Sequence, residues 1–173
     1  MTHSAAGVAA QTSPAAPSPV AHLLARLAER GSTVAVAESL TGGLVTATLT
    51  EVPGSSAVVR GGVVAYATAV KADVLGVGRQ LLAQVGPVSP DVAAEMASKV
   101  RDLLGATYGL ATTGVAGPDP QDDHPVGEVH VAVAGPSGTH VRSLAMTGTR
   151  AQVRLATVDV VLELLADALE HPA

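Results

Sequence analysis

The segment TVAVAESLTGG, residues 33–43, contains the change of pattern from which we infer the fold. Its first part, residues 33–37, is a short valine-rich apolar run, which is typical of a strand buried in a sheet. A helical pattern is expected to begin near residue 41 and to run to about residue 52. A buried strand that leads directly into a helix indicates an α/β domain.

Similar patterns continue along the chain. Ser18, Ser89 and Thr149 are each expected to cap a helix, and the two serines are followed by proline at the first helical position. Thr68 can cap a further short helix that carries Lys71. The other expected elements are a strand over residues 57–67 whose two glycines suggest a bulge or a close backbone approach, a short helix near residues 81–85, a strand over residues 107–113, and a hairpin of residues 128–134 and 139–146.

This order of elements predicts an α/β fold, as a three-layer α/β/α sandwich with a mixed, mostly parallel sheet. Residues 1–18 are rich in Ala, Pro and Ser and are expected to form a disordered tail. Residues 19–170 are expected to form a single domain.

Composition argues against several classes of protein. The 173 residues carry a formal net charge of −5, whereas nucleic-acid-binding proteins usually have a basic excess. The chain has no cysteine, which excludes disulfides, thiolate metal sites and cysteine nucleophiles. It has no secretory leader pattern and no apolar stretch of membrane-spanning length. We therefore expect a soluble, cytoplasmic protein without nucleic-acid or membrane partners.

Ser39 lies where the strand of residues 33–37 meets the following helix. The first amides of a helix have no partner within the helix, so a hydroxyl here is close to donors that can hold a developing oxyanion. Gly42 and Gly43 remove side chains where a ligand would approach. These features favour a nucleophile, but Ser39 or Thr41 could instead simply cap the helix.

A serine nucleophile needs a base to take its proton. None of the six histidines is well placed, but lysine can serve where burial lowers its pKa. The chain has only two lysines against eight arginines, which favours a specific role for Lys71, since arginine does not readily lose its proton. Tyr66, five residues earlier, could relay a proton or donate to the oxyanion. A solvated lysine and a core tyrosine are the alternatives.

Two further segments could bind an anion. The segment TTGVAGP, residues 112–118, follows a strand and leaves backbone amides free, although a tight turn explains it about as well. Arg150 and Arg154 lie four residues apart in the first turns of the last helix, where cations oppose the helix dipole. A bound phosphate would reverse that unfavourable interaction. Surface arginines without a ligand are the alternative.

The loop that follows residue 118 is acidic. Asp119, Asp122, Asp123 and His124 could in principle hold a divalent ion. The prolines in the loop and the lack of a calcium-loop pattern favour a solvated loop instead.

Taken in order, these segments resemble the C-terminal domain of the competence/damage-inducible protein CinA, the nicotinamide-nucleotide amidohydrolase family. The resemblance covers roughly residues 20–169, and it is specific because many separate motifs occur in one order. The motifs are AESLTGG at residues 37–43, PGSS at 53–56, GGVVAY at 61–66, Lys71, GPVS at 86–89, TGVAGPD at 113–119, PVG at 125–127 and GTRAQVR at 148–154.

The resemblance implies hydrolysis of nicotinamide mononucleotide to nicotinate mononucleotide and ammonia, a reaction of NAD salvage in the pyridine nucleotide cycle. It implies that Ser39 is the nucleophile and that Lys71 and Tyr66 activate it. It further implies a homodimer or higher homo-oligomer and no cofactor or metal. We hypothesise that amides near residues 41–43 hold the oxyanion. The expected substrate-binding residues are Thr41, Gly42, Gly43, Thr113, Gly114, Ala116, Gly117, Arg150 and Arg154.

The sequence departs from the family pattern in three places. Leu40 replaces a cysteine, Thr68 replaces an asparagine, and residues 120–124 are acidic and proline-containing where glycines are typical. The family's larger N-terminal domain, associated with nucleotide pyrophosphatase activity, has no counterpart in these residues, so that activity is not expected. Two other functions stay open: a non-catalytic phospholigand-binding or regulatory module, and a hydrolase of another amide-bearing nucleotide.

Overall fold

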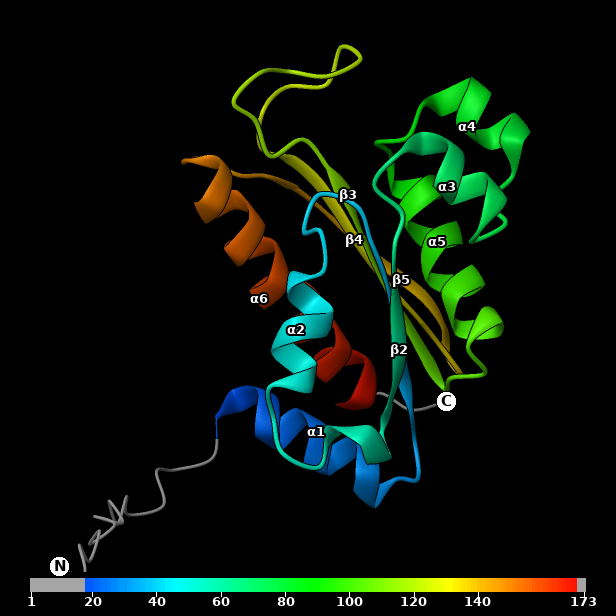
Figure 1. The fold of residues 1–173 in the computed structure, drawn as a ribbon, viewed down its shortest axis with the longest axis vertical. Helices are drawn as coiled ribbons and strands as arrows, with labels where there is room; N and C mark the ends of the chain where they lie inside the picture. The colour runs from blue at the N-terminus through cyan, green and yellow to red at the C-terminus, as the bar shows by residue number, and fades with distance from the viewer. Residues whose placement is uncertain (1–17, 171–173) are drawn as a thin grey trace, which may run out of the picture.

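The computed structural model describes residues 18–170 (Figure 1). Residues 1–17 of the expected tail and residues 171–173 lie outside the described residues. The elements follow in the order α1 (Pro19–Glu29), β1 (Val34–Glu38), α2 (Leu44–Thr50), the 3₁₀ turn η1 (Ser55–Ala57), β2 (Val59–Val64), α3 (Thr68–Asp73), α4 (Arg79–Val85), α5 (Pro90–Leu103), β3 (Tyr108–Gly114), β4 (Glu128–Gly135), β5 (Gly138–Ala145) and α6 (Arg150–Glu170).

The five strands form one sheet in the order β2-β1-β3-β4-β5. β1 pairs in parallel with both β2 and β3, whereas β4 pairs antiparallel with both β3 and β5. Four strands therefore run in one direction and β4 alone runs in the other. The expected mixed, mostly parallel sheet is confirmed.

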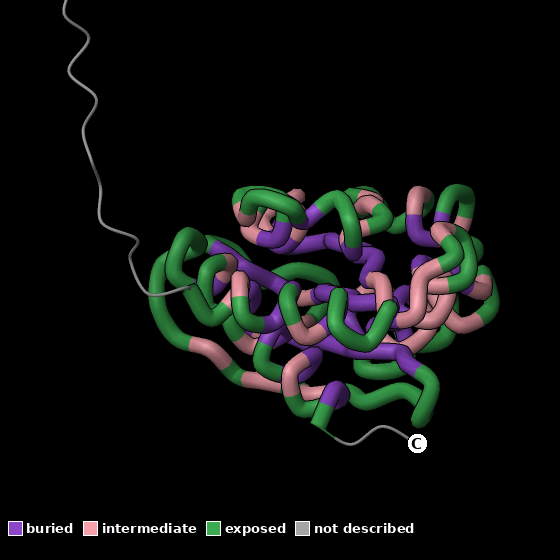
Figure 2. Tube along the Cα trace, turned by 90° about the horizontal axis from the view of Figure 1, so that it is seen from below, coloured by how far each residue is buried: buried purple, intermediate pink, exposed green. Residues whose placement is uncertain are grey.

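Helices cover both faces of this sheet. α1, α2 and α6 lie on one side, and α3, α4 and α5 lie on the other (Figure 1). Seen from below relative to Figure 1, buried residues run through the middle of the molecule and exposed residues line its outer surfaces (Figure 2). The three-layer α/β/α sandwich is confirmed.

The two faces of the sheet carry side chains of different size, because successive residues of a strand point to opposite faces. Valine and leucine fill the face toward α1, α2 and α6, whereas the face toward α5 is largely alanine. The small side chains let α5 lie close to the sheet. At Gly109 of β3 a Cβ atom would stand 2.0 Å from the carbonyl oxygen of Ala97 in α5, so only glycine fits there.

Three of the expected helix caps are confirmed. The Ser18 hydroxyl accepts from the Ala21 amide and the Ser89 hydroxyl from the Val92 amide, each over 3.2 Å. At the start of α6, Gln152 Oε1 accepts from the Thr149 amide over 2.8 Å, and Thr149 Oγ1 accepts from the Gln152 amide over 3.4 Å. This reciprocal pair is a capping box.

Two expected helix starts are wrong. α2 begins at Leu44 rather than near residue 41, because Gly42 and Gly43 adopt φ angles of 59° and 98°, which a right-handed helix does not allow. Thr68 does not cap α3, since it is the first helical residue and the cap position belongs to Ala67, which makes no side-chain cap.

The strand expected over residues 57–67 is shorter, but both interpretations of its glycines are confirmed. Val34 pairs with Val59 and Ala35 with Gly61, so Arg60 is an extra residue at a register shift. At Gly62 a Cβ atom would lie 2.2 Å from Thr46 Oγ1, which shows how closely α2 approaches β2.

The parallel strands bring their carboxyl ends to one edge of the sheet, where ligands usually bind in open α/β sheets. Ser39 follows β1, Tyr66 follows β2 shortly after its end, and Gly114 ends β3. Within residues 18–170, no helix combines the length and the apolar character needed to cross a membrane.

Candidate active site

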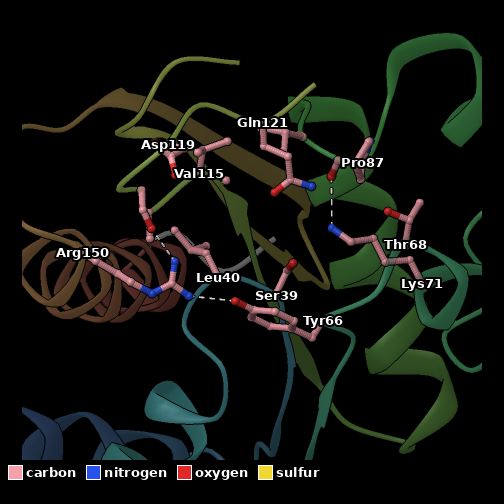
Figure 3. A pocket seen from close by; sticks show the side chains of 14 residues that line it. Ser39, Leu40, Tyr66, Thr68, Lys71, Pro87, Val115, Asp119, Gln121 and Arg150 are labelled. Carbon is pink, nitrogen blue, oxygen red and sulfur yellow. Dashed lines mark hydrogen bonds between the residues drawn. The ribbon is translucent and has the colours of Figure 1, made fainter. Parts of the chain in front are cut away.

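A pocket of about 160 Å³ opens at the carboxyl ends of the strands (Figure 3). Segments far apart in the sequence contribute to it: the turn after β1, the segment from β2 to α3, the link between α4 and α5, the loop after β3 and the start of α6. The lining residues are Ser39, Leu40, Tyr66, Thr68, Lys71, Pro87, Val88, Gly114, Val115, Ala116, Gly117, Asp119, Gln121 and Arg150.

Ser39 occupies the first position beyond β1. Its amide donates to the carbonyl of Thr112 over 3.0 Å, which continues the pairing of β1 with β3 and fixes the backbone at the rim of the pocket. Its hydroxyl points into the pocket and makes no hydrogen bond with any residue that the structure describes (Figure 3). A serine that is 9% exposed is thus held in place with its oxygen free to react.

Glu38, the last residue of β1, is fully buried and caps α2. Its carboxylate accepts from the amides of Gly43, Val45 and Thr46 over 2.9, 3.1 and 2.8 Å, and from Thr46 Oγ1 over 2.7 Å. A carboxylate at a helix N-terminus is also favoured by the helix dipole. The turn that carries Ser39 is therefore held in place by the buried Glu38 carboxylate, which accepts four hydrogen bonds. Sequence reasoning missed Glu38, although a lone acidic residue between an apolar strand and a helix is a usable signal.

The Glu38 cap changes which amides are available near Ser39. Gly43 N–H is taken by Glu38, and Gly42 N–H donates to the carbonyl of Ser39 over 3.1 Å. In this turn, the amides of Leu40 and Thr41 are the ones without a hydrogen bond to the described part of the chain. The available oxyanion donors thus lie earlier in the turn than the glycines we expected.

Lys71 in α3 extends its side chain to the same pocket (Figure 3). The residue is only 1% exposed, and burial lowers the pKa of its amine from 10.5 to about 8. Nζ lies 3.0 Å from the carbonyl oxygen of Pro87 and 2.8 Å from Thr113 Oγ1. The Thr113 hydroxyl donates its own hydrogen to the Pro87 carbonyl over 2.7 Å, so it must accept from Lys71. Two N–H groups of Lys71 are therefore engaged by fixed acceptors.

This arrangement determines what the third position on the Lys71 nitrogen can do. A neutral amine has two hydrogens and one lone pair. With both hydrogens engaged by Pro87 and Thr113, the lone pair is the remaining site on Nζ. A buried amine with a lowered pKa and a free lone pair is the form that can act as a general base.

Tyr66 and Arg150 form a pair on the side of the pocket opposite Lys71 (Figure 3). Arg150 Nη2 donates to the Tyr66 hydroxyl over 2.7 Å, and Arg150 Nη1 donates to the carbonyl of Gly117 over 2.6 Å. Tyr66 is 60% exposed and contacts the arginine rather than Lys71. The structure thus places Tyr66 beside the cation that was expected to bind phosphate.

Five residues expected at the site do not line the pocket: Thr41, Gly42, Gly43, Thr113 and Arg154. Thr41 is fully buried, and its hydroxyl lies 2.8 Å from that of Thr112. Arg154 donates through Nε to the carbonyl of Leu40 over 3.0 Å and through Nη2 to the carbonyl of Thr41 over 2.7 Å. Its two bonds lie behind the Ser39 turn, so its position is that of a support for the turn. Thr113, although outside the lining, contacts Lys71 directly.

The acidic loop after β3 contributes Asp119 and Gln121 to the pocket wall, which sequence reasoning missed. Gln121 and His124 exchange two backbone hydrogen bonds around Asp122 and Asp123, which both have positive φ angles, 48° and 66°. These features describe a tight two-residue turn.

The base of this loop is held by Glu128. Its carboxylate lies 3.0 Å from His124 Nδ1 and 3.2 Å from His130 Nε2. Desolvation raises the pKa of the Glu128 carboxyl, but the two imidazoles outweigh it, and the net shift is downward. Among residues 18–170, no group of three or more acidic or imidazole side chains could hold a metal ion.

Comparison with known proteins identifies relatives of the chain. A model of the CinA C-terminal domain matches residues 18–169. A CinA-like protein of Frankia casuarinae is 56% identical over 143 residues, which are 83% of this chain and 33% of that protein. A CinA-like protein of Anaeromyxobacter sp. (strain K) is 51% identical over 148 residues, which are 85% of this chain and 36% of that protein. The chain thus spans about a third of the length of these relatives.

Solved structures of similar proteins share the fold. The competence/damage inducible protein CihA of Agrobacterium tumefaciens is 38% identical with a TM-score of 0.83, and the match covers 88% of this chain and 93% of that one. The competence damage-inducible protein A (ComA) of Klebsiella pneumoniae is 32% identical with a TM-score of 0.81, and the match covers 87% of this chain and 96% of that one.

Proposed function

Because the chain belongs to the CinA C-terminal domain family, we propose that its pocket is the active site of an amidohydrolase. Ser39 is the nucleophile, Lys71 is the general base, and the substrate is a phosphorylated nucleotide with a carboxamide, nicotinamide mononucleotide. One observation carries the proposal: a buried amine with its N–H groups engaged shares a pocket with a serine hydroxyl that has no partner among the described residues.

The proposed reaction begins when the lone pair on Lys71 Nζ takes the proton of the Ser39 hydroxyl. The serine oxygen bonds to the carboxamide carbon, and the electron pair of the C=O bond moves to its oxygen. The tetrahedral intermediate then re-forms the C=O bond and breaks the C–N bond. Lys71 returns the proton to the departing nitrogen, which leaves as ammonia.

The second half of the reaction uses water. Lys71 takes a proton from a water molecule, whose oxygen attacks the ester carbon of the acyl-enzyme. The ester bond to Ser39 breaks, and the serine oxygen regains its proton from Lys71. The product is the carboxylic acid, which ionises near neutral pH. The cycle needs no cofactor and no co-reactant other than water.

A phosphate group would be bound on the side of the pocket opposite Lys71, beside Arg150. Arg150 uses two of its five N–H donors for Tyr66 and Gly117, which leaves the others for an anion. Ala116 and Gly117 line the pocket, and their amides make no hydrogen bond to the described residues. A guanidinium beside free amides is a favourable setting for a phosphate. We assign Tyr66 the role of orienting Arg150 and the substrate.

Measuring ammonia release from nicotinamide mononucleotide tests the proposal directly. Ser39→Ala is expected to abolish release while nucleotide binding, measured by calorimetry, stays largely intact. Ser55→Ala is the matched control, since Ser55 is equally exposed at 9% and does not line the pocket. Wild-type protein that binds the nucleotide without releasing ammonia would identify a binding module instead. Full activity of Ser39→Ala would contradict the proposed nucleophile.

Substrate choice can be measured in the same assay. We expect nicotinamide mononucleotide to be hydrolysed much faster than nicotinamide riboside or free nicotinamide, because only the first carries a phosphate for Arg150. The preference for phosphate should largely disappear in Arg150→Met. Equal rates for the riboside and the mononucleotide would contradict the assigned phosphate site, and preference for a different amide-bearing nucleotide would correct the substrate.

A further inference from the structure

The turn that carries Ser39 is supported from behind by Arg154. Two consecutive carbonyls, those of Leu40 and Thr41, accept from Arg154 Nε and Nη2 over 3.0 and 2.7 Å. A Cβ atom on Gly42 would lie 3.3 Å from Arg154 Nη2, so the bare backbone there leaves room for the guanidinium. One planar cation thus fixes two adjacent peptide groups of this turn, Leu40–Thr41 and Thr41–Gly42.

The amides in the same turn are free although their residues are buried. Leu40 is 4% exposed and Thr41 is fully buried, and neither amide has a hydrogen-bond partner among the described residues. A buried N–H without a partner is rare in proteins because it loses its hydrogen bonds to water. Two such groups in succession, next to a nucleophile, point to a ligand that supplies the missing acceptor.

The carbonyl contacts also determine the direction of these free amides. In a trans peptide the N–H and C=O bonds point in opposite directions. The Ser39 carbonyl, which shares its peptide with the Leu40 amide, accepts from Gly42 N–H. The Leu40 carbonyl, which shares its peptide with the Thr41 amide, accepts from Arg154. Each free N–H is therefore oriented by a hydrogen bond on the opposite side of its own peptide group.

We propose that Arg154 is a positioning residue for the two donors of the oxyanion formed on attack by Ser39. It orients and polarises the Thr41 amide directly, through the Leu40 carbonyl, and it acts on the Leu40 amide through the Thr41–Gly42 peptide, whose N–H donates to the Ser39 carbonyl. This inference rests on the proposed amidohydrolase function and adds to it the donors and the residue that sets them. A cation on the Leu40 carbonyl withdraws electrons from that peptide and strengthens its N–H as a donor. Donors fixed before the reaction stabilise the charge that develops in the transition state.

This role separates two arginines that lie one helical turn apart on α6. Arg150 lines the pocket, whereas the hydrogen bonds that Arg154 makes within residues 18–170 go to the backbone behind the nucleophile. Loss of Arg150 should weaken substrate binding and raise KM. Loss of Arg154 should lower kcat with little change in KM, because it acts on the transition state rather than on the bound substrate.

The test compares Arg154→Met and Arg154→Lys with Arg150→Met and with the control Arg142→Met. Arg142 pairs with Glu163 and Asp167 of α6 and does not line the pocket, so it reports the general effect of removing an arginine that contacts this helix. We expect Arg154→Met to lower kcat by about tenfold to a hundredfold with KM within about twofold of wild type. Arg154→Lys, which keeps a cation but cannot bind both carbonyls in the same way, should lie between.

A second readout does not depend on turnover. A pyridine-3-boronic acid that forms a tetrahedral adduct with Ser39 should bind Arg154→Met more weakly by the same factor as the fall in kcat, while the affinity for the product nucleotide stays unchanged. If Arg154→Met does not fold, the same comparison is made with Arg154→Lys. Unchanged kcat and adduct affinity in a folded Arg154 variant, with Ser39→Ala inactive, would overturn this role alone. An active Ser39→Ala would instead overturn the proposed function.

Discussion

The amine of Lys71 donates a 2.8 Å hydrogen bond to the hydroxyl of Thr113, and both residues are almost completely buried. The Thr113 hydroxyl donates a hydrogen bond to the Pro87 carbonyl over 2.7 Å, so its oxygen accepts the hydrogen bond from Lys71. Burial disfavours the charged amine and lowers its pKa to about 8. The chemistry and the stability of the protein should both depend on this group.

The first prediction concerns the pH dependence of catalysis. Because only neutral Lys71 can accept the Ser39 proton, kcat/KM should rise about tenfold per pH unit at acidic and neutral pH and level off above a pKa of about 8. Initial rates of ammonia release from pH 6 to pH 9.5 measure this profile.

Variants of the two lysines test whether Lys71 is the group responsible for this pH profile. Lys71→Arg should be inactive at every pH in this range, because arginine keeps its proton. Lys99→Arg, which changes the chain's other lysine, should reproduce the wild-type profile. An active Lys71→Arg, or a wild-type profile flat through pH 8, would contradict the assignment of the base.

The second prediction is that the same lysine lowers stability. Its pKa is about 8 in the folded protein, below the ordinary lysine value of 10.5, so the unfolded chain binds more protons between these pH values. The contribution of Lys71 to the free energy of unfolding is therefore least favourable below pH 8 and improves as the pH rises toward 10.5. Lys71→Met removes the buried cation and should stabilise the protein at pH 7 by on the order of 1–3 kcal/mol, despite the loss of two hydrogen bonds.

Urea unfolding of the wild type and of Lys71→Met at pH 7 and pH 10 measures this effect. The stability advantage of the variant should shrink by about 2–3 kcal/mol between the two pH values, because the wild type loses its penalty as the amine becomes neutral. The variant should also be catalytically inactive. An advantage that does not change with pH would show that the buried amine carries no such penalty.

A third prediction concerns Glu38, whose carboxylate accepts four hydrogen bonds at the start of α2. In Glu38→Gln one of the two oxygens becomes an NH₂ group that faces donors, and the negative charge at the helix N-terminus is lost. We expect a loss of about 2–3 kcal/mol in the free energy of unfolding. Urea denaturation measures it, with the exposed Glu29→Gln as control. Equal stability of the two variants would show that the cap contributes little.

Much of the fold follows from local patterns. Ser18, Ser89 and Thr149 cap helices as expected, and the valine-rich run before Ser39 is a central strand. Helix caps can be predicted from sequence because the capping side-chain oxygen and the backbone N–H that donates to it lie within three residues of each other. The start of α2 was misplaced because a left-handed Gly43 is compatible in sequence with either a loop or a helix.

The candidate site, like the fold, could be predicted from the sequence only in part. Ser39 and Gly114 could be placed at one edge because parallel strands end there, and the structure brings Lys71, Tyr66 and Arg150 to the same pocket. The partners of these groups could not be read from the sequence. Arg154 contacts Leu40 across 114 positions of sequence, and no local pattern records such a contact.

The most direct test of the central claim is to look for the ester on Ser39 during turnover. Wild-type protein is mixed with excess nicotinamide mononucleotide, quenched in acid at successive times and digested for mass spectrometry. We predict a transient acyl group of nicotinate mononucleotide on the peptide that contains Ser39, sensitive to hydroxylamine and absent from Ser39→Ala. Ammonia release in the same samples without an ester on Ser39, or with the acyl group on another residue, would contradict it.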